Sequence, residues 1–276
     1  MRLDSHQHFW RYDAAAYDWI DEQMGVLRRD FVPADLLPLL QRTGRSGCIA
    51  VQARADVAET EWLLRLAAEA PFVRGVVGWV DLLATDVEAQ LDRFAGTRLV
   101  SVRHGLQSEP DAFSEQPAFR RGLRAVAARG LCYDLLVKAP QLPAVIELVS
   151  ALPQATFVLD HFGKPRVAAK EHASWARDLR ALAAFPNVAC KVSGLVTEAM
   201  WSDWNEGLLQ PYFDTALSAF TPARLMFGSD WPVCLCAASY ERWSEVVAGF
   251  VAPLSASEQA AIDGGTAARW YRLDGR

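Results

Sequence analysis

Short apolar runs alternate with longer amphipathic segments along the chain. Each run is almost wholly apolar at its centre, which is typical of parallel strands buried on both faces. Eight such runs cover residues 2–6, 47–52, 73–80, 99–104, 131–138, 156–161, 187–193 and 225–230. Between them, residues 33–42, 58–70, 117–129, 143–152 and 172–185 predict helices, because their apolar side chains recur every three or four positions.

Eight strands alternating with helices indicate repeated βαβ units. The chain has 276 residues, and α/β barrels typically have about 250. We therefore predict one (β/α)8 TIM barrel domain over residues 1–276, since no linker-like tract divides the sequence. The alternative is an open doubly wound sheet, but no Gly-x-Gly-x-x-Gly segment follows a strand.

Charge and composition exclude several classes of protein. The net charge is −5, and no basic cluster that would favour nucleic acid is present. No apolar stretch approaches the roughly 18 residues of a membrane span. The five cysteines form an odd set that does not suggest a disulfide framework. These features predict a cytoplasmic protein whose partner is a small molecule, with the oligomeric state left open.

Polar residues gather where the predicted strands end, which is where barrel enzymes place their catalytic groups. His6 and His8 flank one residue, so on an extended strand both rings point to the same face. His161 ends the sixth predicted strand and Asp230 ends the eighth. Other polar residues at strand ends, which we predict to bind substrate, are Gln52, Arg103, His104, Lys138 and Lys191.

Several long segments of the chain resemble the amidohydrolase superfamily. They are LDSHQHFW, LVSVRHGLQSEPD, VLDHFGKP, NVACKVSGL, RLMFGSDWPVC and GTAARWYRL. Within that superfamily they are similar to the sugar-lactone hydrolases that act on L-fuconolactone and L-rhamnonolactone. The resemblance extends from Leu3 to Leu273, and it implies hydrolysis of a 1,5- or 1,4-lactone to the aldonic acid.

The same resemblance limits the metal content of the site. Binuclear members place a bridging Lys or Glu at strand four, whereas this chain has Arg103 and His104 there. We therefore expect at most one divalent ion, zinc in the first place, held by His6, His8 and Asp230. His161 is a further candidate ligand. The sequence also leaves open the alternative that the enzyme works without a metal ion.

Ester hydrolysis needs an activated water, a stabilised oxyanion and a protonated leaving alcohol. We assign Asp230 as the base, with His6, His8 and His161 as further catalytic residues. The cations at the strand ends suit an anionic intermediate, although they could instead pair with Asp81, Asp134 or Asp160 in a structural network. Trp10 and Trp231 are expected to cover an apolar face of a sugar.

Two other functions remain open from the sequence. The first is an aromatic or dicarboxylate lactone hydrolase, or a decarboxylase, on the same scaffold. Such substrates carry carboxylates and should require several arginines at the mouth, where Arg103 alone is clearly placed. The second is a non-catalytic barrel that binds a sugar acid, which would have no need of a base such as Asp230.

Overall fold

The computed structural model describes residues 1–273, and its centre is one eight-stranded parallel sheet. The strands pair in sequence order from β1 to β8. Their bounds are β1 Leu3–Gln7, β2 Gly47–Val51, β3 Val73–Gly78, β4 Leu99–His104, β5 Cys132–Leu135, β6 Thr156–Leu159, β7 Val188–Val192 and β8 Leu225–Phe227. This order excludes the doubly wound sheet, in which the strand order reverses.

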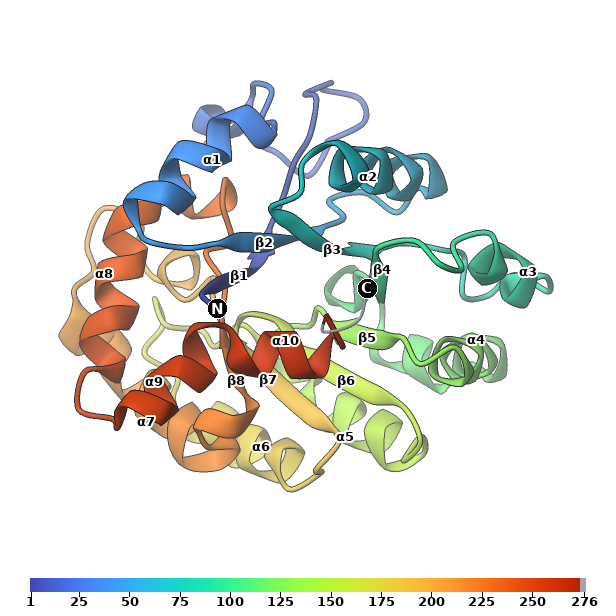
Figure 1. Ribbon diagram of the computed structural model, residues 1–276. Coiled ribbons are helices and arrows are strands. Elements are labelled where there is room, and N and C mark those ends of the chain that lie inside the picture. Colours follow the sequence, from blue (N-terminus) through green and yellow to red (C-terminus); the bar gives the residue numbers. More distant parts are fainter. Residues whose placement is uncertain (274–276) are drawn as a thin grey trace.

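Main-chain hydrogen bonds beyond the strand ends join the last strand to the first. The Asp230 N–H donates to the His6 carbonyl at 2.8 Å, and the His8 N–H donates to the Trp231 carbonyl at 2.7 Å. These bonds close the sheet into the barrel of Figure 1. They also fix Asp230 beside the two histidines before any side-chain contact is considered.

Helices surround the strands and bury their outer faces (Figure 1). They are α1 Pro33–Arg42, α2 Val57–Glu69, α3 Val87–Asp92, α4 Pro117–Ala128, α5 Leu142–Ser150, α6 Ala173–Ala183, α7 Glu206–Phe220, α8 Tyr240–Val251, α9 Ala256–Ala260 and α10 Thr266–Trp270. The five helices predicted from the sequence are confirmed, and their ends differ from the predicted ones by at most two residues.

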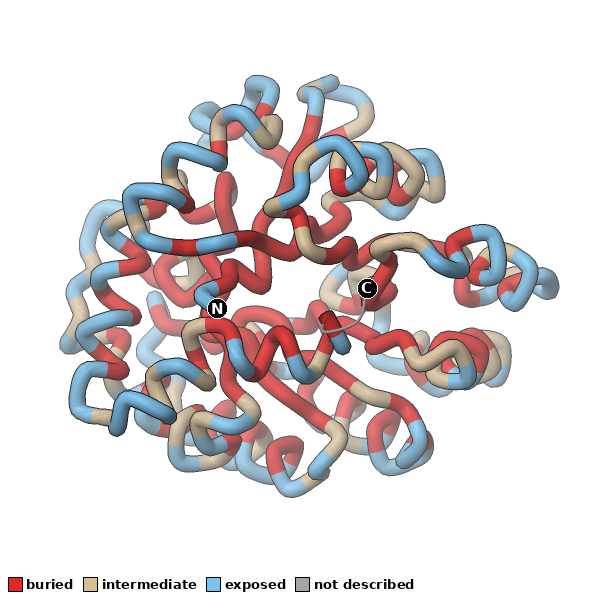
Figure 2. Tube along the Cα trace, in the orientation of Figure 1, coloured by how far each residue is buried: buried red, intermediate tan, exposed pale blue. Residues whose placement is uncertain are grey.

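The apolar core has two parts, one outside the barrel wall and one inside it. The outer part lies between strands and helices, where Figure 2 shows buried segments facing inward and exposed ones facing solvent. The inner part includes Leu3, Ile49, Val158 and Met226, with Tyr271 packed against them. Helix α10 therefore closes the N-terminal end of the barrel, in front in Figure 1, and leaves the opposite end for a site.

Four predicted strands extend two or three residues too far, and one of them is β6, which ends at Leu159 rather than at residue 161. The other three are β3, β5 and β8. The structure ends β3 at Gly78, β5 at Leu135 and β8 at Phe227, whereas the apolar runs continued to residues 80, 138 and 230. After β8 the backbone leaves the extended conformation, and Asp230 has a φ of 58°. His161 and Asp230 thus lie in turns that follow their strands, whereas His6 lies within β1.

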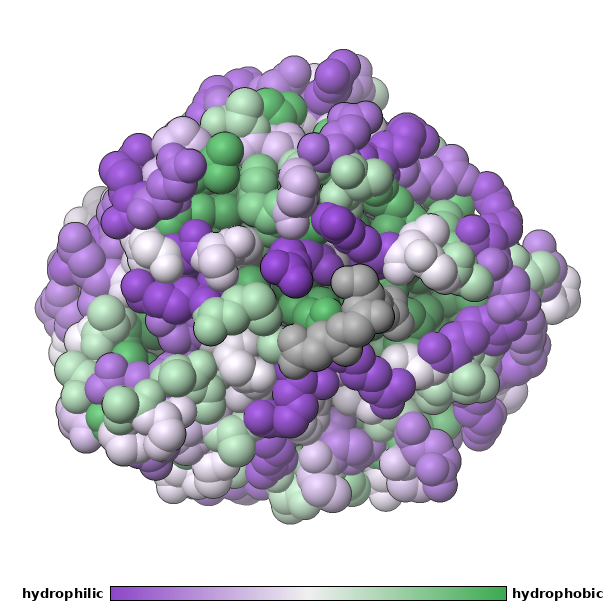
Figure 3. All heavy atoms as spheres, in the orientation of Figure 1, coloured by the Kyte–Doolittle hydropathy of each residue, from purple (hydrophilic) through white to green (hydrophobic). Residues whose placement is uncertain are grey.

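The surface of the N-terminal end is mixed in character. Figure 3 shows hydrophilic side chains over much of this face, with hydrophobic patches between them. Within residues 1–273, no helix combines the length and the apolar character needed to cross a bilayer.

Candidate active site

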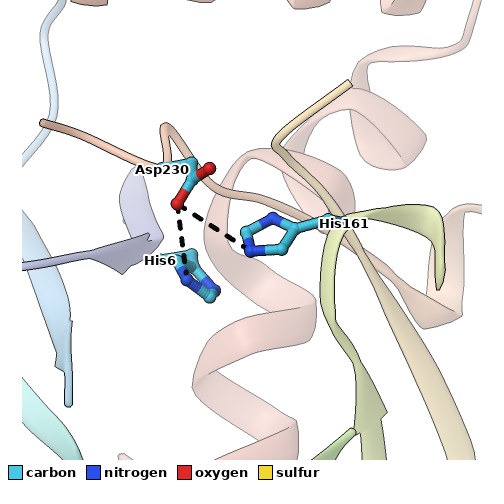
Figure 4. A group of neighbouring side chains, drawn as sticks. All are labelled: His6, His161 and Asp230. Atoms are coloured by element: carbon cyan, nitrogen blue, oxygen red, sulfur yellow. Dashed lines mark ion pairs between the residues drawn. The ribbon is translucent and has the colours of Figure 1, made fainter. Parts of the chain in front are cut away.

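Four side chains predicted from strand ends meet at the C-terminal end of the barrel. His6 Nε2 lies 3.2 Å from His8 Nε2. Asp230 Oδ1 lies 3.4 Å from His8 Nε2, 3.7 Å from His6 Nε2 and 3.8 Å from His161 Nε2. Figure 4 shows Asp230 facing both His6 and His161. The predicted convergence of these four residues is confirmed.

The backbone at two of these residues is left-handed. His161 has a φ of 53° and Asp230 a φ of 58°, which is uncommon for residues other than glycine and is concentrated at functional sites. Gly194 follows β7 with a φ of 64°, and a Cβ there would lie 2.5 Å from His161 Nδ1. The absence of a side chain at position 194 therefore leaves room for the His161 ring.

Polar contacts on the far side of each ring leave its Nε2 atom facing Asp230. His8 Nδ1 lies 2.8 Å from the Val51 carbonyl, which can only accept, so Nδ1 carries a proton and Nε2 is the nitrogen that faces Asp230. His161 Nδ1 contacts Ser193 Oγ at 2.9 Å. His6 Nδ1 lies 3.2 Å from Asp160 Oδ1. Such outer contacts are typical of histidines that bind metal.

The protonation states of the cluster suit metal binding and proton transfer. Burial lowers the pKa of His161 to about 4 although Asp230 opposes the shift, so its ring is neutral at pH 7. Burial alone would raise the pKa of Asp230, but the neighbouring His161 and His8 outweigh it and hold the carboxyl well below its usual pKa. Neutral imidazoles and an ionised carboxylate are the forms that bind a divalent ion.

Four of the six separations between the four donor atoms are close to those of a tetrahedral site. Ligands about 2.0–2.1 Å from a tetrahedral zinc are separated from one another by about 3.3–3.4 Å. The separations of 3.2–3.8 Å around Asp230 and between His6 and His8 fall close to this range. His6, His161 and Asp230 meet the distance requirement for a three-ligand metal group. The sequence analysis predicted His6, His8 and Asp230 as metal ligands, with His161 as a further candidate. The structure supports His161 as a member of this set.

Beneath the cluster lies a fully buried network of charges. Lys191 Nζ contacts Asp134 Oδ2 at 2.5 Å, Asp160 Oδ1 at 2.9 Å and His6 Nδ1 at 3.0 Å. Arg103 Nη1 pairs with Asp160 Oδ2 at 3.0 Å. Burial raises the pKa of Asp160, but Lys191 and His6 more than offset it, so this carboxyl lies well below its usual pKa. The sequence analysis left open that these cations pair with aspartates in a structural network. The structure shows this pairing for Arg103 and Lys191.

This network gives buried protein partners to three residues that the sequence predicts to bind substrate. The Lys191 side chain is fully buried and that of Arg103 is 4% exposed, so their charges are directed into the barrel. Gln52 is buried too, with its amide nitrogen donating to the Arg103 carbonyl, while Arg103 Nη2 donates to the Gln52 carbonyl. These residues support the site from below.

His104 points away from the cluster, and within residues 1–273 the Lys138 side chain has no hydrogen bond or ion pair with any of its four residues. His104 follows Arg103 on β4 and therefore points to the opposite, helix-facing side, where it contacts Trp79, Glu109 and Phe113. Lys138 is exposed, and within residues 1–273 its side chain makes no hydrogen bond or ion pair. Its main-chain N–H donates to Gln141.

The two tryptophans predicted to cover a sugar are buried instead. Trp10 is 0% exposed, and its indole N–H donates to the Arg29 carbonyl. Trp231 is 2% exposed and packs edge-on against Phe31. Both rings stabilise the long loop between β1 and α1, because they are covered by its aromatic residues.

Comparison with known proteins places the chain in a family. The family model described as Amidohydrolase matches residues 3–273. The chain belongs to this amidohydrolase family. The resemblance seen in the sequence is therefore confirmed, and the barrel fold with it.

Two relatives of this amidohydrolase are named L-fucono-1,5-lactonase. The protein from Burkholderia multivorans is 47% identical, with 99% of this chain and 96% of that protein covered. The protein from Burkholderia ambifaria is 35% identical, and the match again covers 99% of this chain and 96% of that protein. A crystal structure of a Burkholderia multivorans amidohydrolase with bound zinc has a TM-score of 0.97 and 46% identity, covering 99% of both chains.

Proposed function

We propose that this amidohydrolase opens a sugar 1,5-lactone of the L-fuconolactone type to its aldonate. The observation that carries the proposal is the convergence of His6, His8 and His161 on the ionised Asp230. The two relatives named L-fucono-1,5-lactonase support the choice of substrate. Hydrolysis requires a base such as the ionised Asp230, whereas a protein that only binds a sugar acid needs no base.

In the proposed reaction, Asp230 accepts a proton as water attacks the lactone carbonyl carbon. The new carbon–oxygen bond forms, the bond to the ring oxygen breaks, and the leaving alkoxide takes up the proton. The neutral His161 ring lies beside the same carboxylate and orients the carbonyl. Because both groups are held by backbone and by Ser193, little reorganisation is needed during the reaction.

His6, His161 and Asp230 would hold a single zinc ion, because their ligand atoms all lie within 4.8 Å of one another. His8, whose Nε2 lies 3.2 Å from His6 Nε2, is a further candidate ligand. Three protein ligands would leave one tetrahedral position open for water. When bound, zinc supplies a positive charge that polarises a carbonyl and lowers the pKa of water. The crystal structure of the Burkholderia multivorans relative contains zinc, which supports zinc over other divalent ions here.

We expect one zinc ion per chain, because no bridging Lys or Glu lies among the four candidate ligands. Inductively coupled plasma mass spectrometry of protein purified without chelator measures this ratio. His161→Ala should reduce the zinc content below about a tenth of the wild-type value, since only two of the three ligands in the metal group would remain. Two tightly bound ions per chain would contradict the ligand count.

An aromatic dicarboxylate hydrolase or a decarboxylase is less well supported. Substrates of that kind carry carboxylates that call for free arginines, whereas Arg103 is already paired with Asp160 and the Gln52 carbonyl.

The state of the cysteines bears on the compartment in which the reaction takes place. Free thiols are carried by Cys48, Cys190, Cys234 and Cys236. Reduced thiols are typical of cytoplasmic proteins, which supports the proposal that the reaction takes place in the cytoplasm.

A panel of substrates followed with a pH indicator tests the proposed function, because each lactone opened releases one acid. The panel contains L-fucono-1,5-lactone, a 1,4-lactone of the same sugar, 2-pyrone-4,6-dicarboxylate and 2,6-dihydroxybenzoate. We expect kcat/KM for the 1,5-lactone to exceed those for the two aromatic acids by at least about 10³-fold. Faster turnover of the pyrone or loss of carbon dioxide from the benzoate would overturn the proposal.

A further inference from the structure

The residues described so far leave recognition of the sugar unexplained. A polyhydroxylated lactone needs polar groups that solvent can reach, but Arg103 and Lys191 are buried and paired. Lys164 and Glu198 differ from them, since their side chains are 23% and 24% exposed. They form an ion pair with each other across two loops, and the sequence analysis assigned neither of them to the site.

Both residues are carried by the backbone that positions His161. Lys164 ends a left-handed run that begins at His161, with φ of 53° at the first residue and 47° at the last. The Lys164 N–H donates to the His161 carbonyl at 2.8 Å, which closes this turn. Glu198 ends the 3-10 turn Val196–Glu198 that follows Gly194, the residue packed against the His161 ring. The pair therefore lies on the loops at the C-terminal end of the barrel.

The ion pair leaves most of its hydrogen-bonding capacity unused. Lys164 Nζ and Glu198 Oε1 are 3.6 Å apart, which is too long for a hydrogen bond. Within residues 1–273, neither side chain is part of any other ion pair or hydrogen bond. An ammonium has three donors and a carboxylate about four acceptor positions, so the pair can bind several hydroxyl groups at once.

Electrostatic coupling also ties the pair to the catalytic cluster. Burial raises the pKa of Glu198, Lys164 opposes that rise, and the charge of Asp230 adds to it. Lys164 is in turn among the charges that lower the pKa of His161. Both residues thus act on the cluster at short range without belonging to the candidate ligand set.

We propose that Lys164 and Glu198 form the substrate-recognition pair of this enzyme. Glu198 accepts hydrogen bonds from ring hydroxyls of the sugar lactone, and Lys164 donates to the lactone and holds the carboxylate of the aldonate product. This inference rests on the proposed lactonase function and adds the groups that determine its specificity.

The test compares Lys164→Met and Glu198→Gln with the wild type on L-fucono-1,5-lactone. Loss of a hydrogen bond to a charged group typically lowers affinity by roughly tenfold to a hundredfold. We expect KM to rise by that factor, with kcat changed less than about threefold and the zinc content unchanged. Binding of L-fuconate, measured by isothermal titration calorimetry, should weaken by a similar factor in Lys164→Met.

A matched control is available in the same region. Arg166 and Glu171 form an exposed ion pair at 3.2 Å, and we expect Arg166→Met and Glu171→Gln to keep KM within about twofold. If the wild type opens the lactone and the Lys164 and Glu198 variants match it in KM and in L-fuconate binding, the recognition pair is wrong and the lactonase function stands. If the wild type neither opens the lactone nor binds L-fuconate, both proposals are wrong.

Discussion

Replacing Asp230 with asparagine should lower kcat/KM for L-fucono-1,5-lactone by about 10²–10⁴-fold, the usual cost of removing a general base. Asparagine keeps the shape of the side chain but cannot accept a proton. Because Asp230 also lies 3.4–3.8 Å from the three histidine nitrogens, zinc content should fall in the same variant. Steady-state kinetics and metal analysis measure the two effects separately.

Asp18→Asn is the matched control for this experiment. Asp18 is exposed, so the same chemical change there should leave kcat/KM within about twofold. Circular dichroism should show that both variants are folded. A folded Asp230→Asn protein that keeps more than about a third of the wild-type activity would mean that another group, His161 first, takes the proton.

The second large effect is expected on stability, from Lys191→Met. The Lys191 ammonium is fully buried and contacts two buried carboxylates, Asp134 and Asp160. Removing one partner of a buried ion pair leaves uncompensated charge and typically costs about 3–5 kcal/mol of unfolding free energy. Urea unfolding followed by fluorescence and circular dichroism measures the change.

Lys138→Met provides the comparison, because Lys138 is exposed. Its unfolding free energy should stay within about 0.5 kcal/mol of the wild-type value. A Lys191→Met protein as stable as the wild type would show that Asp134 and Asp160 do not depend on this lysine. Loss of soluble expression in that variant alone would agree with the prediction.

Strand periodicity explains which parts of the site the sequence could predict. His6 and His8 were placed correctly because residues two apart on a strand share a face. His161 and Asp230 follow from the rule that barrel strands end at the active site. The same alternation could have separated Arg103 from His104, since neighbouring strand residues point to opposite faces.

Other features depend on contacts that the sequence does not reveal. Lys191 and Arg103 lie at predicted strand positions, but their carboxylate partners come from β5 and from the turn after β6. Lys164 lies at the end of a left-handed turn. Gly163 is the only residue of that turn whose type indicates such a conformation. Trp10 and Trp231 were predicted to be accessible because the loop that buries them has no periodic pattern.

The most direct test of the central claim is the rate at which purified protein opens L-fucono-1,5-lactone, followed by proton NMR. We predict opening far faster than the spontaneous reaction with the wild type, and a rate near the spontaneous one with Asp230→Asn prepared in the same way. A wild-type rate equal to the spontaneous rate, or equal rates for the two proteins, would contradict a hydrolytic centre built on Asp230 and the three histidines.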